Sequence, residues 1–412
     1  MSQTDHSSLE TPSVPVFKEK LSKYLFDLIV RHLNFHDFFR FGRIDKHHRQ
    51  LFLKSNKWKI VDLSTYPREK MVDKVIYQFT STLNYYSKEF SGVMPSAETL
   101  NLNGQFQLTE SSLQYIANCI LLNNLSSLSL ITCTKIKNIS SFFKTSQPRT
   151  TLTTLAIPTL SYHGIMELLP NLSSVTSLEV PGAIEKILFY RVLESAPNLK
   201  SITLKFRSSD NLFGPYILEK FMLFTGITSV YFSNMNMDNE DFLKIFISLN
   251  NLETVFVINN FSLTGTTVNT LLETSKSLNQ LSIKYCRNVS HIYEISDSLT
   301  IFDGSHTRPC PDIQFKNIVN LSISNWKLTP EITSSIFEKE YNSLRYLDLT
   351  NCNLNDQLLL PILTGIGRKL IRIDLSTNEI TNQSLPVILE HCKSLYKIDL
   401  LVSLYIIFYI TP

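Results

Sequence analysis

Apolar residues occupy the first, fourth and sixth positions of a six-residue phrase that recurs along most of the chain. The copies are AETLNL (97–102), LSSLSL (125–130), LTTLAI (152–157), VTSLEV (175–180), LKSITL (199–204), ITSVYF (227–232), LETVFV (252–257), LNQLSI (278–283), IVNLSI (318–323), LRYLDL (344–349), LIRIDL (370–375) and LYKIDL (395–400). The alternation at the end of each copy predicts a short strand with two inward side chains. Between copies, as in residues 241–251 and 384–394, apolar positions recur at helical spacing. The pattern therefore predicts about twelve strand-and-helix units.

The spacing of the copies identifies the kind of array. Their fourth positions are Leu100, Leu128, Leu155, Leu178, Ile202, Val230, Val255, Leu281, Leu321, Leu347, Ile373 and Ile398. Every step but one is 23 to 28 residues, inside the period of leucine-rich repeats, which the phrase itself also resembles. The resemblance implies an α/β solenoid that curves, with short parallel strands on its concave face and helices on its convex face. One unit cannot bury its apolar face alone, so stacked units share a continuous core.

A polar column accompanies the repeat five residues after each fourth position. Its clear members are Cys133, Asn260, Cys286, Cys352 and Asn378, and its irregular members are Arg207, Met235 and Trp326. This column resembles the cysteine-containing subclass of leucine-rich repeats, in which the side chain bonds the turning backbone. Three of the six cysteines thereby gain a structural role. We expect no metal and no cofactor.

The exceptional step, from Leu281 to Leu321, is 40 residues long. It holds an insertion at 287–317, and Asp-Gly and Pro-Cys-Pro interrupt any regular element in residues 296–315. We expect this stretch to leave the solenoid as a loop. It is either a binding element on a rigid array or a disordered insertion.

A different pattern precedes the repeats. Residues 16–62 carry eleven Lys or Arg and five acids, and their apolar residues form short helical stripes. The order Leu21-Ser22-Lys23-Tyr24-Leu25-Phe26, then Ile29 and Leu33, then Asp37-Phe38-Phe39-Arg40-Phe41, Ile44, a basic turn and Trp58 resembles an F-box. The resemblance implies a small all-α module that docks a Skp-family adaptor and, through it, a cullin. The adaptor-binding residues it implies are Leu21, Leu25, Leu28, Ile29, Leu33, Phe38, Phe39, Ile44 and Trp58.

Two alternatives remain open for this segment. Its helices could cap the open end of the solenoid, which every repeat array needs. Arg40, Arg43, Lys46 and Arg49 could instead form a stripe for nucleic acid. The net charge of only +3 over 412 residues argues against a nucleic-acid footprint across the whole chain.

The domain organisation follows from these changes of pattern. We expect a disordered tail at 1–15, the F-box-like helical module at 16–62, a linker or N-terminal cap at 63–94 and the repeats at 95–400. The apolar residues 401–412 depart from the repeat, and one hypothesis is that they are translated intron. They are too few to span a bilayer, and the polar first residues are not a signal peptide. We therefore expect a cytoplasmic or nuclear protein without a membrane partner.

The side chains between and just after the inward pairs point to the concave face. In the middle repeats they bring together aromatic and charged residues, as protein-binding hot spots do: Lys205, Tyr231, Phe256, Ile258, Lys284 and Tyr285. Farther along, Asp348 and Asp374 form an acidic column with Asp399 that could bind a basic segment or merely follow the repeat pattern. The chain has no Walker loop, H-E-x-x-H or G-x-S-x-G, so we expect no catalytic residue.

Together the two resemblances predict the substrate-recognition subunit of a cullin-type ubiquitin ligase, itself not an enzyme. The F-box would dock the adaptor, and the repeats would bind a target protein. The alternative is a leucine-rich-repeat scaffold or regulator without a ligase link, whose N-terminal helices only cap the solenoid.

Overall fold

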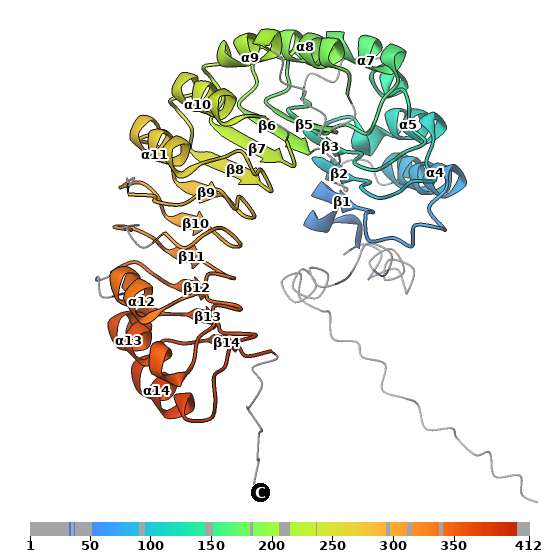
Figure 1. Ribbon diagram of the computed structural model, residues 1–412. Helices are drawn as coiled ribbons and strands as arrows, with labels where there is room; N and C mark the ends of the chain where they lie inside the picture. Colours follow the sequence, from blue (N-terminus) through green and yellow to red (C-terminus); the bar gives the residue numbers. More distant parts are fainter. Residues whose placement is uncertain are drawn as a thin grey trace, which may run out of the picture.

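One parallel sheet lines the inner side of an arc, and helices cover much of its outer side (Figure 1). The computed structural model describes Leu33, Asp37 and residues 52–89, 95–144, 151–181, 184–205, 215–235, 237–293, 297–310, 315–337 and 341–401. Within these residues the sheet has fourteen strands, which pair in sequence order. The chain is thus the leucine-rich-repeat solenoid that its sequence predicts.

Most strands are three residues long, and those in the middle of the array reach five. In chain order they are β1 (Ile60–Asp62), β2 (Thr99–Asn101), β3 (Ser127–Ser129), β4 (Thr154–Ala156), β5 (Ser177–Pro181), β6 (Ser201–Lys205), β7 (Ser229–Ser233), β8 (Thr254–Ile258), β9 (Gln280–Ser282), β10 (Ile301–Asp303), β11 (Asn320–Ser322), β12 (Tyr346–Asp348), β13 (Arg372–Asp374) and β14 (Lys397–Asp399).

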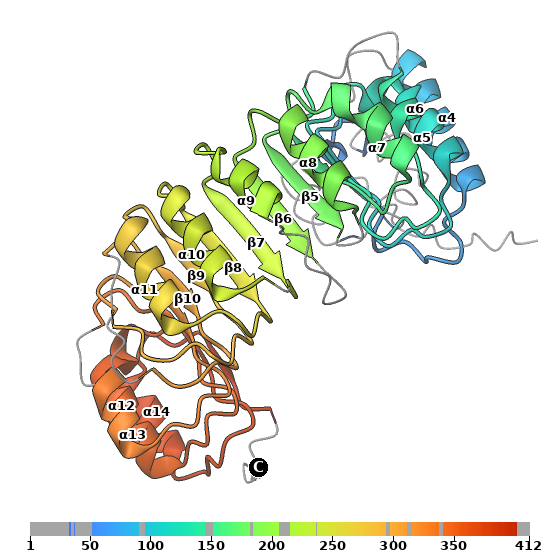
Figure 2. The same cartoon turned by 45° about the horizontal axis from the view of Figure 1, so that its top comes forward.

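The helices return the chain along the convex side. They are α4 (Asp73–Glu89), α5 (Glu110–Ala117), α6 (Ser140–Phe143), α7 (Tyr162–Leu168), α8 (Lys186–Ser195), α9 (Pro215–Met222), α10 (Asn239–Ser248), α11 (Gly265–Thr274), α12 (Pro330–Phe337), α13 (Asp356–Ile366) and α14 (Ser384–His391). Four short 3-10 helices join them: η1 (Asn56–Lys59), η2 (Ile120–Leu122), η3 (Leu169–Asn171) and η4 (Gly367–Lys369). Figure 2 shows α8 to α11 side by side along the sheet, and neighbours in this row are in contact.

The register of the sheet aligns the inward residues of successive repeats. Leu100 lies opposite Leu128, and Leu128 lies opposite Leu155. All three side chains are fully buried in one core that runs the length of the array. Truncating such a residue to alanine costs about 2–5 kcal/mol.

The turns after nine of the described strands share one backbone conformation. The fourth residue after the inward leucine or its equivalent has a positive φ, between +54° and +80°, at Gly104, Thr132, Asn234, Asn259, Tyr285, His306, Asn325, Asn351 and Thr377. Four of these are asparagine, which tolerates left-handed backbone better than most residues. The next residue belongs to the polar column, so this turn aims the column into the core.

The bond predicted for the polar column is confirmed. Each clear member donates to a carbonyl oxygen of the preceding repeat: Cys133 to Leu102 (3.1 Å), Asn260 to Phe232 (3.3 Å), Cys286 to Val257 (3.1 Å), Cys352 to Ile323 (3.2 Å) and Asn378 to Leu349 (2.8 Å). Burial raises the pKa of Cys133, Cys286 and Cys352 to about 12, so they stay thiols and can donate. Gln105 and the irregular Trp326 make the same bond, to Leu63 (2.6 Å) and Gly304 (2.8 Å).

The expectation that the 40-residue step from Leu281 to Leu321 leaves the array as a loop is wrong for the residues that the structure describes. Residues 301–303 form β10, which pairs in register with β9 on one side and β11 on the other. Gly304 stands where the second inward side chain of a repeat belongs. A Cβ there would lie 2.7 Å from the ring of Phe302 and 3.1 Å from that of Trp326, so these rings fill the space instead. No helix is described between β9 and β11 (Figure 1).

The sheet also begins earlier than the sequence predicts. Strand β1 lies inside the range assigned to the F-box-like module, and it pairs with β2 in register. Trp58, Val61 and Leu63 occupy the first, fourth and sixth positions of the repeat phrase and are buried. The indole Nε1 of Trp58 donates to the carbonyl of Phe52 at 2.7 Å, and the two rings meet edge to face at 4.9 Å. Residues 58–63 therefore form the inner part of a first repeat.

A second contact between repeats ties the helix N-termini together. Asp356, at the start of α13, accepts bonds from the backbone N–H and hydroxyl of Thr381 (3.0 and 2.6 Å) and from the hydroxyl of Ser384 in the next repeat. Burial acts to raise the pKa of Asp356, but these bonds outweigh it and hold the pKa below its usual value. Asp73 receives the same set of bonds from Thr109 and Ser112.

Candidate protein-binding surface

The concave face of β6 to β8 carries a half-buried aromatic pair. Tyr231 and Phe256 lie opposite each other in the register of β7 and β8, with ring centroids 5.6 Å apart and planes tilted by 33°. Both are half-buried because alternate strand residues face away from the core. Ile258 lies at the end of β8 on the same face. We call Tyr231, Phe256 and Ile258 the aromatic patch.

Lys205 connects this patch to the neighbouring strand. Its ammonium nitrogen lies 5.1 Å from the centroid of the Tyr231 ring and 2.8 Å from a carboxylate oxygen of Glu179. The lysine is thus positioned by a cation–π contact and an ion pair at once. The structure brings Lys205, Tyr231, Phe256 and Ile258 together on adjacent strands, as the sequence analysis expects. A partial apolar surface with a polar rim is the arrangement typical of binding hot spots.

Tyr285 lies beside the patch, at the edge of the array rather than on the sheet. Its ring stacks on that of His306 at 4.1 Å and 20°, and the ammonium of Lys284 lies 5.6 Å from its centroid. The side-chain amide nitrogen of Asn325 lies 3.1 Å from Nε2 of His306. Burial lowers the pKa of His306, and the charges of Lys284 and Arg287 lower it further, while Asp303 and Asp348 oppose them. Sequence reasoning missed His306 because it did not recognise β10.

The acidic column lies at the concave ends of later strands. Asp303, Asp348 and Asp374 each accept a bond at 3.0 Å from the backbone N–H two residues ahead, so one oxygen of each carboxylate stabilises the turn. Together they line a hollow of about 320 Å³ with Tyr346. The predicted binding of a basic segment by Asp348 and Asp374 stays a prediction. Asp399 is already paired with Arg372 (2.9 Å) and Lys397 (3.0 Å).

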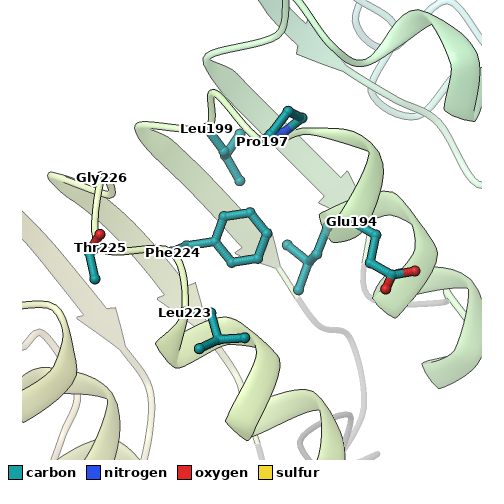
Figure 3. Close-up of a pocket in the computed structure, with 8 residues that line it drawn as sticks. Glu194, Pro197, Leu199, Leu223, Phe224, Thr225 and Gly226 are labelled. Carbon is teal, nitrogen blue, oxygen red and sulfur yellow. The ribbon is translucent and has the colours of Figure 1, made fainter.

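A separate groove on the opposite edge was not predicted. It lies between the ends of α8 and α9 and the strands that follow them, and it encloses about 310 Å³ (Figure 3). Its wall is mostly apolar, with Leu193, Leu199, Phe224 and a 70% exposed Leu223, beside the carboxylate of Glu194. Among the described side chains, one acid is the only charged group that lines it, so these residues offer little that would orient a polar ligand.

Most of the predicted adaptor-binding residues lie outside the described part of the chain: Leu21, Leu25, Leu28, Ile29, Phe38, Phe39 and Ile44. Leu33 is half-buried against the core, and the ammonium of Lys57 donates to its carbonyl at 2.7 Å. Trp58 is only 2% exposed, so its indole packs inside the first repeat. The adaptor surface itself stays a prediction, as do the tails at 1–15 and 402–412.

Within the described residues, no cluster of three or more His, Cys, Asp or Glu side chains could hold a metal ion. No described helix is both long and apolar enough to cross a bilayer. All six cysteines are buried, and none forms a disulfide.

Comparisons with known proteins show no family. No family model matches the chain, and no curated protein matches it. A chain in the crystal structure of the Rad7 and Elc1 complex in yeast is 15% identical, with a TM-score of 0.43 over 80% of this chain and 81% of that one. A chain in the crystal structure of the TLR13–ssRNA13 complex is 15% identical, with a TM-score of 0.47 over 75% of this chain and 52% of that one.

Proposed function

We propose that this chain is a non-catalytic protein-binding subunit, the substrate receptor of a cullin-type ubiquitin ligase. The observation that carries the binding role is the aromatic patch with Lys205 on the concave face. A rigid sheet holds these side chains, so binding would order few of them and would lose little conformational entropy. The ligase role rests on the F-box resemblance of residues 16–62.

In this proposal the chain works by proximity. The N-terminal segment docks a Skp-family adaptor, and the patch holds a target near the conjugating enzyme, where a high local concentration replaces a second diffusional encounter. Catalysis then belongs to other subunits.

The alternative is a scaffold in which the N-terminal helices only cap the array, and one contact favours it. Leu33 packs on the core and accepts the bond from Lys57, so part of the N-terminal segment lies against the first repeat. A cap and an adaptor-binding module can use different faces of one segment, so the experiment has to separate them.

The test is co-purification of the tagged full chain from its own cells. The native chain should recover a Skp-family adaptor, a cullin and a target. Leu25→Ala with Phe38→Ala should lose the adaptor and cullin and keep the target. Tyr231→Ala with Phe256→Ala should keep the adaptor and lose the target, because each truncated hot spot costs about 2 kcal/mol, roughly 30-fold in affinity.

The matched control is Tyr162→Ala with Tyr396→Ala, which removes two aromatic rings that are 58% and 90% exposed and lie outside the aromatic patch. It should recover adaptor and target like the native chain. A folded native chain that recovers no adaptor would refute the ligase role and leave the scaffold. Loss of target in the control pair as well would refute the assignment to the patch.

A further inference from the structure

Three consecutive repeats place a cation at the same position of their turns. Counting six residues from the inward residues of β9, β10 and β11 (281, 302 and 321) gives Arg287, Arg308 and Lys327. Only the discovery of β10 brings these residues into one column, because the 40-residue step hides the middle repeat in the sequence. We call Arg287, Arg308 and Lys327 the cationic rim.

The backbone of the three turns is equivalent. In each, the residue of the polar column donates its N–H to the carbonyl three residues back at 3.1 Å: Cys286 to Ile283, Thr307 to Gly304 and Trp326 to Ile323. The register also continues past the strands, since the N–H of Tyr285 bonds Ser305 and that of His306 bonds Ser324, both at 2.9 Å. Neighbouring strands lie about 4.8 Å apart, so the backbone positions of the three rim residues span roughly 10 Å.

No acid of the described residues pairs with the cationic rim. All three side chains are exposed, and none forms an ion pair with another described residue. Arg287 and Arg308 line one hollow of about 340 Å³ together with His306 and Asn325. Like charges held this close repel one another, so an anionic group in the hollow would relieve a repulsion as well as add attraction.

The hollow also supplies fixed neutral groups. The His306 ring stacks on the Tyr285 ring, its Nε2 lies 3.1 Å from the amide nitrogen of Asn325, and the ammonium of Lys284 lies 5.6 Å from the Tyr285 centroid. The amide N–H groups of Asn325 are directed at His306 and Ser324, so the amide fixes the imidazole, and a neutral imidazole carries one ring N–H that can donate to an oxyanion without adding charge. The aromatic patch begins one strand away, because Asn259, which follows Ile258, bonds the carbonyl of Lys284 at 2.9 Å.

We propose that the cationic rim binds an extended acidic segment of the same protein partner whose apolar residues the aromatic patch holds. The inference rests on the proposed binding function and names the chemistry of its partner. In an extended segment, alternate side chains lie about 6.6–6.8 Å apart on one side, so two carboxylates fit within the roughly 10 Å of the rim. A nucleic-acid backbone fits less well, since it engages many phosphates in a row, and Asp303, Asp348 and Asp374 lie on the adjoining concave face.

The test uses the purified full chain and a fluorescein-labelled hexaglutamate peptide, with binding followed by anisotropy at low salt. Charge reversal of the rim (R287E, R308E and K327E) should weaken binding at least tenfold. The matched control (R191E, K276E and R368E) reverses three exposed cations on the helical and strand-entry sides and makes the same change in net charge. It should change binding less than twofold, and both variants should keep the native melting temperature.

Equal weakening by the two triple variants would overturn the proposal, because only net charge would then matter. No binding of hexaglutamate by the native chain would overturn it too. A labelled thymidine dodecamer that binds more tightly than hexaglutamate and depends on the rim would assign the cations to nucleic acid instead. Tyr231→Ala with Phe256→Ala should leave hexaglutamate binding intact, and no adaptor is present, so this assay can succeed where the co-purification fails.

Discussion

Asn378 offers the sharpest test of how the repeats are held together. Its side-chain oxygen accepts the N–H groups of Cys352 (2.9 Å) and Leu354 (3.1 Å), and its nitrogen donates to Leu349 (2.8 Å) and Leu375 (2.9 Å). The residue is 3% exposed, so water cannot replace it. Asn378→Ala leaves two backbone donors buried without an acceptor, at about 1–3 kcal/mol each. We expect a loss of about 2–6 kcal/mol in the free energy of unfolding.

Cys352 provides the matched comparison one repeat earlier in the same column. Its thiol donates to the Ile323 carbonyl at 3.2 Å, and the backbone N–H groups of Asn325 and Trp326 face its sulfur, which is a weak acceptor. Cys352→Ala therefore removes one weak donor, a weak acceptor and a small volume, and we expect about 1 kcal/mol. The difference between the two variants compares the strong acceptor of asparagine with the weak one of cysteine.

Amide hydrogen exchange is the suitable assay, because repeat arrays can open locally before they unfold. In Asn378→Ala the amides of Cys352 and Leu354 should exchange at least 30-fold faster, the equivalent of about 2 kcal/mol. In Cys352→Ala they should keep most of their protection. Equal protection in the two variants, or a loss below about 1 kcal/mol for Asn378→Ala, would refute the account.

Three further predictions concern the joints between repeats. Gly265→Ala should lower the melting temperature strongly, because its Cβ would lie 1.7 Å from the carbonyl oxygen of the next turn, whereas Gly226→Ala, with its nearest contact at 3.9 Å, should not. The lowered pKa of Asp356 means that its contribution to stability is present above the unfolded pKa and is lost as pH falls through the folded pKa; Asp356→Asn should flatten the acid limb of a stability–pH curve. Trp326→Phe removes both the indole N–H that donates to the Gly304 carbonyl and the part of the buried ring that fills the space beside Gly304, so denaturant melts should show a loss of at least about 1 kcal/mol.

The periodic part of the fold was predictable because burial imposes it on every unit. Two inward apolar residues per strand and one donor in the polar column recur, so position alone identifies them. Where an unusual residue occupies one of these positions, the repeat is not recognised from the sequence. Trp58 meets the first apolar position of a repeat, but tryptophan also fits the end of an F-box-like segment, and the first repeat was missed.

The repeat of β10 was missed for a related reason. Gly304 breaks the phrase, and the volume it lacks comes from Trp326, 22 residues later in the chain. That a side chain of one repeat fills the space left by a glycine of another can be recognised only when the repeats are stacked in the structure. Lys205, Tyr231 and Phe256 were predictable because each lies in a well-formed copy. His306, Arg287 and Arg308 acquire a shared position only once β10 pairs with its neighbours.

The short repeats also explain why the two candidate surfaces lie together. From β9 to β11 the inward residues are 21 and 19 residues apart, from Leu281 to Phe302 and from Phe302 to Leu321, and no helix is described between those strands. Successive turns in this region are therefore only about 20 residues apart, and the strands before them still pair in register. Strands β7 and β8, which precede β9 in the sheet, are five residues long. Their extra length carries the aromatic patch toward the turns that follow the strands. A partner that contacts both the aromatic patch and the cationic rim would thus bind across the boundary between the repeats that have a helix and the short repeats. The array is least uniform at this boundary.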